Sequence, residues 1–144
     1  MRPFARELLE AANEDFEVIV FTASQRAYAD KVIDYLDPTG RLVHHRLYRE
    51  HCTVVGNVLV KDLRVLANRQ QQDLLIVDNA AVSFVYQLDN GVPIRSWFGD
   101  PADQELAKLQ KHLKRLACCK DLVRENARVF DLRGFHAACR QRTT

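Results

Sequence analysis

Two short apolar runs, each stopped by polar residues, constrain the fold of this chain more than any other feature. Residues 16–21 are aromatic or β-branched apart from Glu17, and residues 74–77 are apolar throughout. Both runs are too short for a helix and are typical of buried strands in a parallel sheet. Thr22 and Asp78 follow them directly. Because ligands bind beyond the carboxyl ends of parallel strands, these two positions predict a shared site.

Helical periodicity surrounds the two runs. Apolar side chains recur at helical spacing within residues 4–12, 28–36 and 106–116. The second stretch is followed by a proline and a glycine, which end a helix in a turn. Asp100 and Pro101 predict the N-cap and the first residue of the third helix. Helices that alternate with buried strands predict one doubly wound, Rossmann-like α/β domain with helices on both faces of its sheet.

Residues 42–60 interrupt this alternation with short β-rich pieces. Gly56 and Asn57 lie between two of the pieces, as expected of a hairpin turn. We therefore predict a small antiparallel β insertion. A helical turn is expected over residues 63–68, and a last short strand over residues 92–94.

The composition is that of one ordinary globular domain. The chain has 144 residues, of which 47% are hydrophobic and 28% charged, which allows a single core and excludes a disordered chain. No apolar run approaches the roughly 18 to 20 residues that span a bilayer. The four cysteines lack Cys-x-x-Cys spacing, which argues against zinc and favours a reducing compartment. We therefore expect a nuclear or cytoplasmic protein without a membrane span.

The charge is distributed unevenly along the chain. Residues 108–144 contain 10 Lys or Arg against 3 Asp or Glu, whereas the rest contains 11 against 16. Such a basic region can attract an acidic partner, but it is more often a solvated helix face. Nucleic-acid binding is disfavoured, because the region has no interleaved aromatic residues and no motif that reads a groove.

The residues after the predicted strands suit phosphate chemistry. Thr22 and Ser24 would present hydroxyl and backbone N–H groups at a helix N-terminus, which binds phosphate. Asp78 and Asn79 offer oxygen ligands for a hard cation such as Mg²⁺, and Lys61 could add a positive charge. Each residue also has an ordinary interpretation as a cap, a turn or a solvated lysine. Their combination favours a phosphoryl site.

A set of short motifs occurs in an order and spacing that resembles a known enzyme family. In chain order they are Arg2-Pro3, Val20-Phe21-Thr22-Ala23-Ser24, Tyr28-Ala29-Asp30, Leu47-Tyr48-Arg49-Glu50-His51-Cys52, Val60-Lys61-Asp62-Leu63, Ile76-Val77-Asp78-Asn79 and Pro93-Ile94-Arg95-Ser96-Trp97-Phe98. They resemble the small phosphatases of the RNA polymerase II C-terminal domain, also called the NLI-interacting-factor-like or Dullard-like group of the haloacid-dehalogenase superfamily. Residues 42–52 and 86–91 look closest to the small phosphatase-like branch.

The resemblance implies a fold, an activity and a cofactor. It implies a haloacid-dehalogenase sheet and Mg²⁺-dependent hydrolysis of phosphoserine or phosphothreonine in proteins through an aspartyl-phosphate. By this similarity Thr22 would hold the phosphoryl oxygens and Lys61 would neutralise them. Asn79 would ligate Mg²⁺, with Asp78 beside it in support.

The resemblance also implies a substrate site and domain limits. Tyr28 and Arg49 match positions of the family's substrate groove, and Ser24 would contact the substrate next to them. The likeness covers nearly the whole chain and predicts a phosphatase-like domain over residues 1–130. Residues 131–144 would form a basic C-terminal tail.

One motif of the family does not occur in this sequence. The family's first strand carries Asp-x-Asp-x-Thr, which supplies the nucleophile and the acid/base residue, and no Asp-x-Asp triplet occurs anywhere in the 144 residues. Without a nucleophile, covalent catalysis has no first step. We therefore predict a chain that is inactive by itself. The alternative function is a non-catalytic module of the same fold that binds phosphopeptides or proteins.

The absent strand also has a consequence for folding. In the superfamily it lies between the strands predicted at residues 16–21 and 74–77, so its absence would leave two apolar strands with open inner edges. Such a sheet must close up, recruit another chain or be unstable. We predict that the 144-residue chain is marginally stable or prone to aggregation by itself, and that a partner chain could complete its sheet. A cooperative thermal transition of a monomer well above room temperature would contradict this.

Overall fold

The computed structural model describes residues 1–141, in which helices alternate with strands. The α-helices are α1 (Ala5–Asp15), α2 (Arg26–Leu36), α3 (Glu105–Ala117), α4 (Leu122–Phe130) and α5 (Leu132–Gln141). The strands are β1 (Ile19–Phe21), β2 (His45–Leu47), β3 (Thr53–Val55), β4 (Val58–Val60), β5 (Ile76–Asp78) and β6 (Gly91–Pro93). Short 3₁₀ segments are η1 (Arg49–His51), η2 (Leu63–Val65), η3 (Gln71–Asp73) and η4 (Ala81–Asn90). This order confirms the predicted α/β class.

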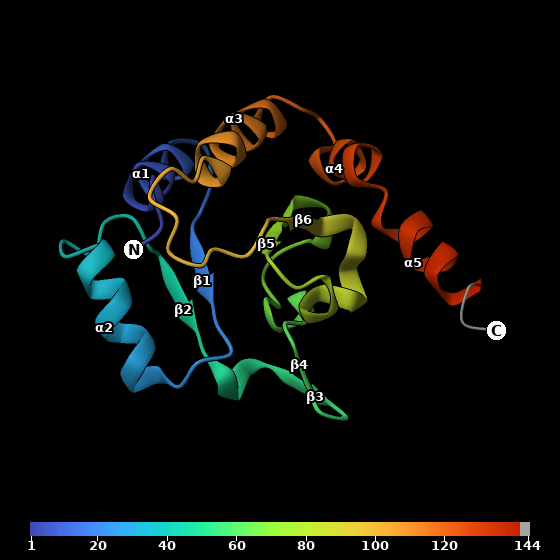
Figure 1. Cartoon of the computed structure of the whole chain (residues 1–144), viewed down its shortest axis with the longest axis horizontal. Helices are drawn as coiled ribbons and strands as arrows, with labels where there is room; N and C mark the ends of the chain where they lie inside the picture. Colours follow the sequence, from blue (N-terminus) through green and yellow to red (C-terminus); the bar gives the residue numbers. More distant parts are fainter. Residues whose placement is uncertain (142–144) are drawn as a thin grey trace.

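The strands form separate pairs among the described residues (Figure 1). β1 and β2 are parallel, with Val20 opposite Arg46, and β5 and β6 are parallel, with Val77 opposite Val92. β3 and β4 form an antiparallel hairpin, in which Gly56 adopts a positive φ of 57°. The hairpin confirms the predicted insertion. The two parallel pairs are not hydrogen-bonded to each other among these residues.

Helix α2 packs on the β1–β2 pair. Ala29 and Ile33 of α2 are buried against Val43 and Tyr48, and Val20 of β1 packs on the same cluster. This cluster is small because its helix contributes only these two buried residues.

The exposed face of α2 differs from the sequence pattern. Tyr28, Val32 and Tyr35 share a face, but it is turned to solvent, with 66%, 42% and 73% of each residue exposed. The face that contacts the strands holds the smaller Ala29 and the branched Ile33. The spacing of the larger apolar side chains thus predicted the helix correctly. These side chains lie on its solvent-exposed face rather than on the face that packs against the strands.

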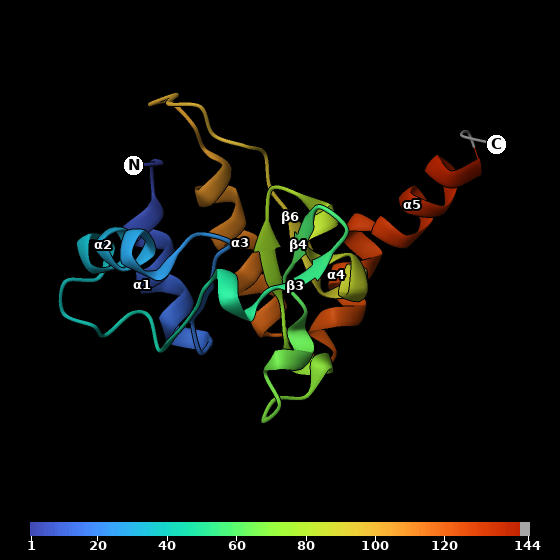
Figure 2. The same cartoon turned by 90° about the horizontal axis from the view of Figure 1, so that it is seen from below.

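The β5–β6 pair has apolar side chains on both faces. Phe84 of η4 is completely buried and packs with Ile76 and Leu63. On the opposite face Val92 of β6 packs on Leu109 of α3. Figure 2 shows α3 and η4 on the two sides of this pair. The pair therefore has a layer on each face, as expected of a doubly wound sheet.

Helix α3 begins later than predicted. Its first residue is Glu105 rather than Pro101, so the predicted N-cap at Asp100 is wrong. Asp103 instead accepts the Glu105 N–H at 3.1 Å and pairs with the Arg2 guanidinium at 2.8 Å. An ion pair between residues far apart in the sequence thus accompanies the helix start, which local sequence cannot reveal.

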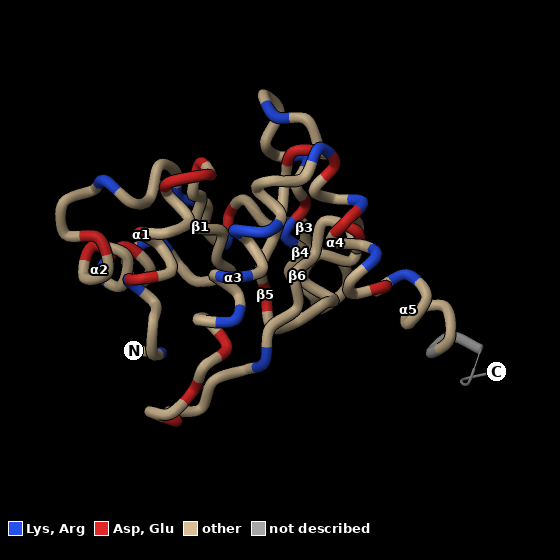
Figure 3. Tube along the Cα trace, turned by 90° about the horizontal axis from the view of Figure 1, so that it is seen from above, with Lys and Arg blue, Asp and Glu red and all other residues tan. Residues whose placement is uncertain are grey.

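The C-terminal helices carry much of the basic charge, but several of these side chains are paired. Lys114 contacts Asp15, Arg128 contacts Glu125, and Arg133 contacts Asp89 within 2.9 Å. Figure 3 shows acidic and basic residues interspersed along the trace. The asymmetry read from the sequence is therefore partly neutralised in the fold. Among the described residues, no helix combines the length and the apolar character that a bilayer crossing requires.

Candidate functional site

The loop after β1 is held by hydrogen bonds that present its backbone at the carboxyl edge of the strand. The Thr22 N–H donates to the Leu47 carbonyl at 2.9 Å, and the Ser24 N–H donates to the Thr22 hydroxyl oxygen at 3.0 Å. Arg49 of η1 anchors the loop, because its Nε donates to the Ala23 carbonyl at 2.8 Å. The structure thus brings together three of the residues predicted for the site, Thr22, Ser24 and Arg49.

Helix α2 is tied to η1 next to this loop. The Arg26 guanidinium lies 4.3 Å from the centroid of the Tyr48 ring and pairs with Glu50. The Tyr48 hydroxyl donates to Asp30 at 2.6 Å, which lowers the pKa of that carboxyl. Tyr28, predicted to contact substrate, is exposed on the first turns of the helix. Tyr28 is therefore accessible to a substrate, and the contacts between α2 and η1 hold the neighbouring segment in place.

The loop after β5 contains a nearly buried ion pair. Lys61 Nζ donates to Asp78 Oδ2 at 2.5 Å, and the two side chains are only 14% and 8% exposed. The other carboxylate oxygen of Asp78 accepts the Ala80 N–H at 2.8 Å. Asn79 is exposed, and its Nδ2 donates to the Ser96 hydroxyl at 2.8 Å. Both Asp78 oxygens are thus engaged by the protein, whereas Asn79 presents an amide oxygen at the surface.

Cys52 lies between the loop after β1 and the segment before η1. Its Sγ lies 4.0 Å from the Thr22 carbonyl and 3.9 Å from the Tyr48 carbonyl. Burial raises the pKa of the thiol, and the positive charges of Lys61 and Arg49 partly oppose this. The sequence analysis disfavoured Cys52 as a zinc ligand and quoted it in a family motif, but did not predict its contacts with Thr22 and Tyr48. The sequence indicated this place of Cys52 only by its position directly after the segment that contains Arg49.

The arrangement suits an anion and, in part, a hard cation. Lys61 pairs with the last residue of β5, and Arg49 is bonded to the loop after β1. Cations close to phosphoryl oxygens stabilise them. Asp78 and Asn79 offer the oxygen atoms that Mg²⁺ prefers. The part of the chain that the structure describes holds no cluster of three or more His, Cys, Asp or Glu side chains. These donors therefore fit Mg²⁺ in kind but are too few to hold it alone.

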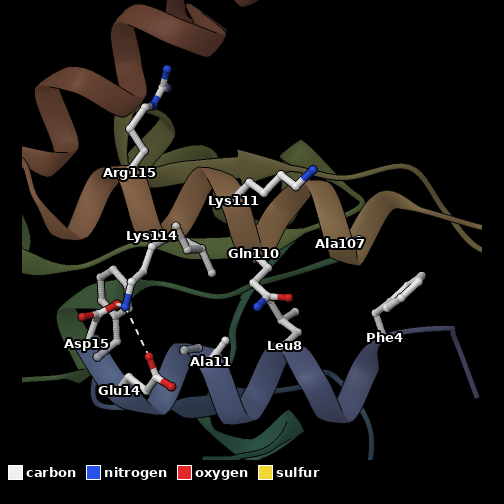
Figure 4. A pocket seen from close by; sticks show the side chains of 13 residues that line it. Phe4, Leu8, Ala11, Glu14, Asp15, Ala107, Gln110, Lys111, Lys114 and Arg115 are labelled. Atoms are coloured by element: carbon white, nitrogen blue, oxygen red, sulfur yellow. Dashed lines mark hydrogen bonds and ion pairs between the residues drawn. The ribbon is translucent and has the colours of Figure 1, made fainter.

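A groove away from these residues lies between two helices of the chain. It has a volume of about 630 Å³ and runs between α1 and α3. Figure 4 shows Leu8, Ala11 and Gln110 pointing toward one another across it. At one end Lys114 pairs with Glu14 at 3.2 Å and with Asp15 at 2.9 Å. This groove contains no residue of the predicted site.

The fold places the chain in a known class of α/β proteins. It superposes on the RNA polymerase II CTD phosphatase Fcp1 with a TM-score of 0.70 and 19% identity, covering 81% of this chain and 46% of that one. A second structure, fission yeast Fcp1 in a variant bound to beryllium fluoride, gives a TM-score of 0.68 with 17% identity and the same coverage. At such identities the likeness shows the fold alone.

Sequence similarity shows the family. The profile of the NLI interacting factor-like phosphatases matches residues 1–124, and the chain belongs to this family. It is 47% identical over 125 residues to CTD small phosphatase-like protein 3 of Caenorhabditis elegans, covering 87% of this chain and 43% of that protein. It is 40% identical over 121 residues to the human carboxy-terminal domain RNA polymerase II polypeptide A small phosphatase 2, covering 84% and 44%. The chain thus spans less than half the length of these relatives.

Proposed function

We propose that this chain forms the phosphate- and Mg²⁺-binding part of a protein phosphatase that acts on phosphoserine or phosphothreonine. The observation that carries the proposal is the Lys61–Asp78 pair, 2.5 Å apart and mostly buried at the carboxyl end of β5. An ammonium held in place by a carboxylate costs little reorganisation when an anion binds. Relatives named as CTD small phosphatases support the same reaction class.

The residues of the chain have distinct roles in this proposal. Thr22 and the N–H groups of its loop hold the phosphoryl oxygens, and Lys61 neutralises them while Asp78 orients Lys61. Asn79, with Asp78 beside it, supplies oxygen ligands to Mg²⁺, which when bound offsets phosphoryl charge. Further ligands have to come from elsewhere, because the described donors are too few.

The substrate side of the site lies on the outer surface. Tyr28 and Ser24 would contact the protein chain that carries the phosphate, and Arg49 would add a positive charge next to it. Arg49 is itself exposed and is oriented by its bond to the Ala23 carbonyl. We place the phosphatase-like domain at residues 1–130, with residues 131–144 as a basic tail, and expect a nuclear or cytoplasmic location.

The nucleophile is the part that this sequence does not supply. No Asp-x-Asp triplet occurs in the 144 residues. Hydrolysis therefore requires a segment with Asp-x-Asp-x-Thr, and the chain by itself binds the phosphate without cleaving it. A non-catalytic phosphopeptide-binding module is the second candidate. It is favoured by the loop after β1, which the bonds of Ser24 to Thr22 and of Arg49 to Ala23 hold without such a segment.

Two measurements on two proteins test the proposal. Phosphopeptide binding and Mg²⁺-dependent hydrolysis of an aryl phosphate are compared for this chain and for the chain extended at its amino end by an Asp-x-Asp-x-Thr segment. We expect both proteins to bind and only the extended one to hydrolyse. An extended protein that binds as well but hydrolyses nothing would favour the binding module.

Variants assign the roles within the extended protein. Lys61→Met and Asn79→Ala should each lower the turnover rate by about 100-fold or more, the usual effect of removing one group that stabilises transition-state charge. Lys31→Met removes an exposed lysine of α2 and serves as the matched control, with turnover unchanged. Equal rates for Lys61→Met and Lys31→Met would overturn the role given to Lys61.

A further inference from the structure

The outer face of helix α2 carries three large apolar side chains. Tyr28, Val32 and Tyr35 are three or four residues apart, so they form one row along the helix, here called the α2 stripe. Single apolar residues at a surface are ordinary, whereas a contiguous group of them marks a candidate binding surface. Figures 1 and 2 show α2 at the end of the molecule opposite α5, on the outer side of the β1–β2 pair. The stripe is therefore open to a ligand.

The helix that carries the stripe is firmly held from its other side. Arg46 of β2 pairs with Asp30 at 2.9 Å and with Asp34 at 2.8 Å, so one guanidinium spans two turns of α2. Asp37, directly after the helix, is 2% exposed, and its carboxylate accepts three backbone N–H groups of residues 41–43. Little further ordering of α2 is therefore needed when a ligand binds, which favours affinity.

The stripe begins next to the proposed phosphate loop. The Tyr28 N–H donates to the Gln25 carbonyl at 3.2 Å, and the carbonyl of Ser24, the residue before, accepts the Arg49 N–H at 3.1 Å. From residue 28 to residue 35 a helix rises about 10 Å. An extended chain covers this distance with about three residues. A polypeptide with its phosphate in the loop can therefore lay neighbouring residues on the stripe.

The size of the stripe indicates which kind of ligand it suits. A stable interface between two folded proteins buries about 800 Å² on each partner. Three side chains of one 11-residue helix provide only a part of this area, so they would hold a second copy of the chain weakly. A segment that is already anchored by its phosphate needs only a small additional contact, because the anchor raises its local concentration.

We propose that the α2 stripe binds the segment next to the phosphorylated residue of the protein substrate and selects apolar side chains there. Val32 and Tyr35 are then specificity-determining residues, which extend the substrate surface along the helix beyond Tyr28. Only one flank of the phosphorylated residue lies on the stripe, because α2 leaves the loop in one direction. This inference rests on the proposed function, since the phosphate in the loop is the anchor.

Three fluorescent phosphoserine peptides, titrated into the chain and followed by anisotropy, test the selection. Two leucines separated by one residue lie within five residues after the phosphoserine in the first peptide and before it in the second, and alanines replace them in the third. One leucine peptide should bind about tenfold more tightly than the alanine peptide, the gain expected from partial burial of apolar side chains. The other should bind like the alanine peptide.

The outcomes of this titration separate the two proposals. Equal affinities of the three peptides, or an equal gain from leucines on both sides, would overturn the selection by the stripe and leave the proposed function standing. If none of the peptides binds, the proposed function fails and the inference fails with it. The unphosphorylated leucine peptide should bind about tenfold more weakly, because it lacks charge-assisted hydrogen bonds. If it binds as tightly, the ligand is not anchored by phosphate and the inference is wrong.

Surface variants assign the selection to α2. Val32→Ser and Tyr35→Ser should each reduce the advantage of the leucine peptide over the alanine peptide by about threefold. Val54→Ser is the matched control, since Val54 is 70% exposed on the hairpin strand β3, and it should keep the full advantage. Circular dichroism checks that the variants fold, and the peptide series decides the selection with the unaltered chain. The same reduction in Val54→Ser as in Val32→Ser would contradict the role of the stripe.

A spin label on the peptide locates the bound segment. A nitroxide at the leucine end should broaden the NMR signals of the Val32 methyl groups and leave those of Val54 sharp. Broadening elsewhere without any at Val32 would overturn the proposal. A dimeric mass of the free chain that Tyr35→Ser converts to a monomeric mass would assign the stripe to a second copy, and this would also overturn it.

Discussion

The two parallel strand pairs differ in how completely they are packed. Around β5 and β6, Phe84, Leu116 and Asn126 are entirely buried. Around β1 and β2, the most buried apolar residue is Tyr48, at 3% exposure, and every residue of β1 is only partly buried. Apolar side chains pack on both faces of the β5–β6 pair, whereas one small cluster packs on the β1–β2 pair. We therefore expect the β5–β6 half to contribute more of the free energy of unfolding.

A buried polar contact reinforces the better packed half. Asn126 of α4 donates from Nδ2 to the carbonyls of Asp89 and Gly91, at 3.0 and 2.8 Å, and its Oδ1 lies 3.1 Å from His112 Nε2. A fully satisfied buried amide fixes how the elements around it pack, because leaving its partners unpaired is costly. This contact secures α4 against β6. No residue of α1 is held in a comparable way by burial.

The largest expected effect compares the same substitution in the two halves. Phe84→Ala should destabilise the protein by about 3–5 kcal/mol, the usual cost of removing a completely buried aromatic ring. Phe21→Ala should cost about 1 kcal/mol, because the ring borders an open groove and little new cavity forms. Urea unfolding followed by circular dichroism measures both. Similar losses for the two variants would show that the halves are equally packed.

The next effect concerns the close contact between η4 and β6. A Cβ at position 91 would overlap the ring of Phe84, so Gly91→Ala should cost about 1–3 kcal/mol through overpacking. The test is the double variant with Phe84→Leu, whose smaller side chain makes room for the methyl group. In the double variant the alanine should cost less than it does alone. Additive losses would mean that the glycine is required for another reason.

Much of the fold could be predicted from the sequence because its signals are local. The run that contains Val20 predicted strand β1, and the run that contains Val77 predicted strand β5. The glycine between the short β-rich pieces predicted the hairpin of the insertion. The parts that could not be predicted depend on partners far away in the chain. At the start of helix α3, Asp103 accepts the Glu105 N–H and is bound by Arg2, and no pattern within a dozen residues carries that information.

The candidate site shows the same division. Polar residues after strands predicted that Thr22 and Asp78 lie at one edge. The sequence could not show that Lys61 donates a hydrogen bond to one carboxylate oxygen of Asp78. Arg49 was identified only through the family resemblance, since one arginine in a loop carries no signal by itself. The contact of Cys52 with the Thr22 carbonyl became visible only in three dimensions.

Asp62, the residue directly before η2, should contribute a smaller and pH-dependent part of the free energy of unfolding of the β5–β6 half. Asp62 accepts the Arg64 N–H and the Gln87 amide, and Arg64 lowers the pKa of its carboxyl to about 2, from an ordinary value of 3.8. A carboxyl with a lowered pKa stabilises the fold above its ordinary pKa, and this stability is lost as the pH falls toward the folded value. Unfolding free energies between pH 5 and pH 2 should therefore fall less steeply in Asp62→Asn than in the parent protein.

At pH 7 the same substitution should destabilise the protein by about 1–3 kcal/mol, because it weakens charged hydrogen bonds that are largely buried. Asp34→Asn is the matched control, since Asp34 is exposed on α2. Parallel pH curves for Asp62→Asn and the parent would mean that the Asp62 pKa is ordinary in the folded state.

The smallest effect tests how firmly the two halves are joined. Glu17 precedes β1, and Arg69 precedes η3 and β5. Arg69 Nη2 lies 2.7 Å from Glu17 Oε1, and Arg69 lowers the pKa of Glu17 to about 2. Both side chains are more than 30% exposed, so salt screens their attraction and the pair stabilises little. Arg69→Gln should therefore barely change the unfolding of the β5–β6 half. It should accelerate hydrogen exchange of the β1 amides, because every residue of β1 is only partly buried. Equal acceleration in both halves would mean that they unfold as one unit and that the contrast in packing has no thermodynamic counterpart.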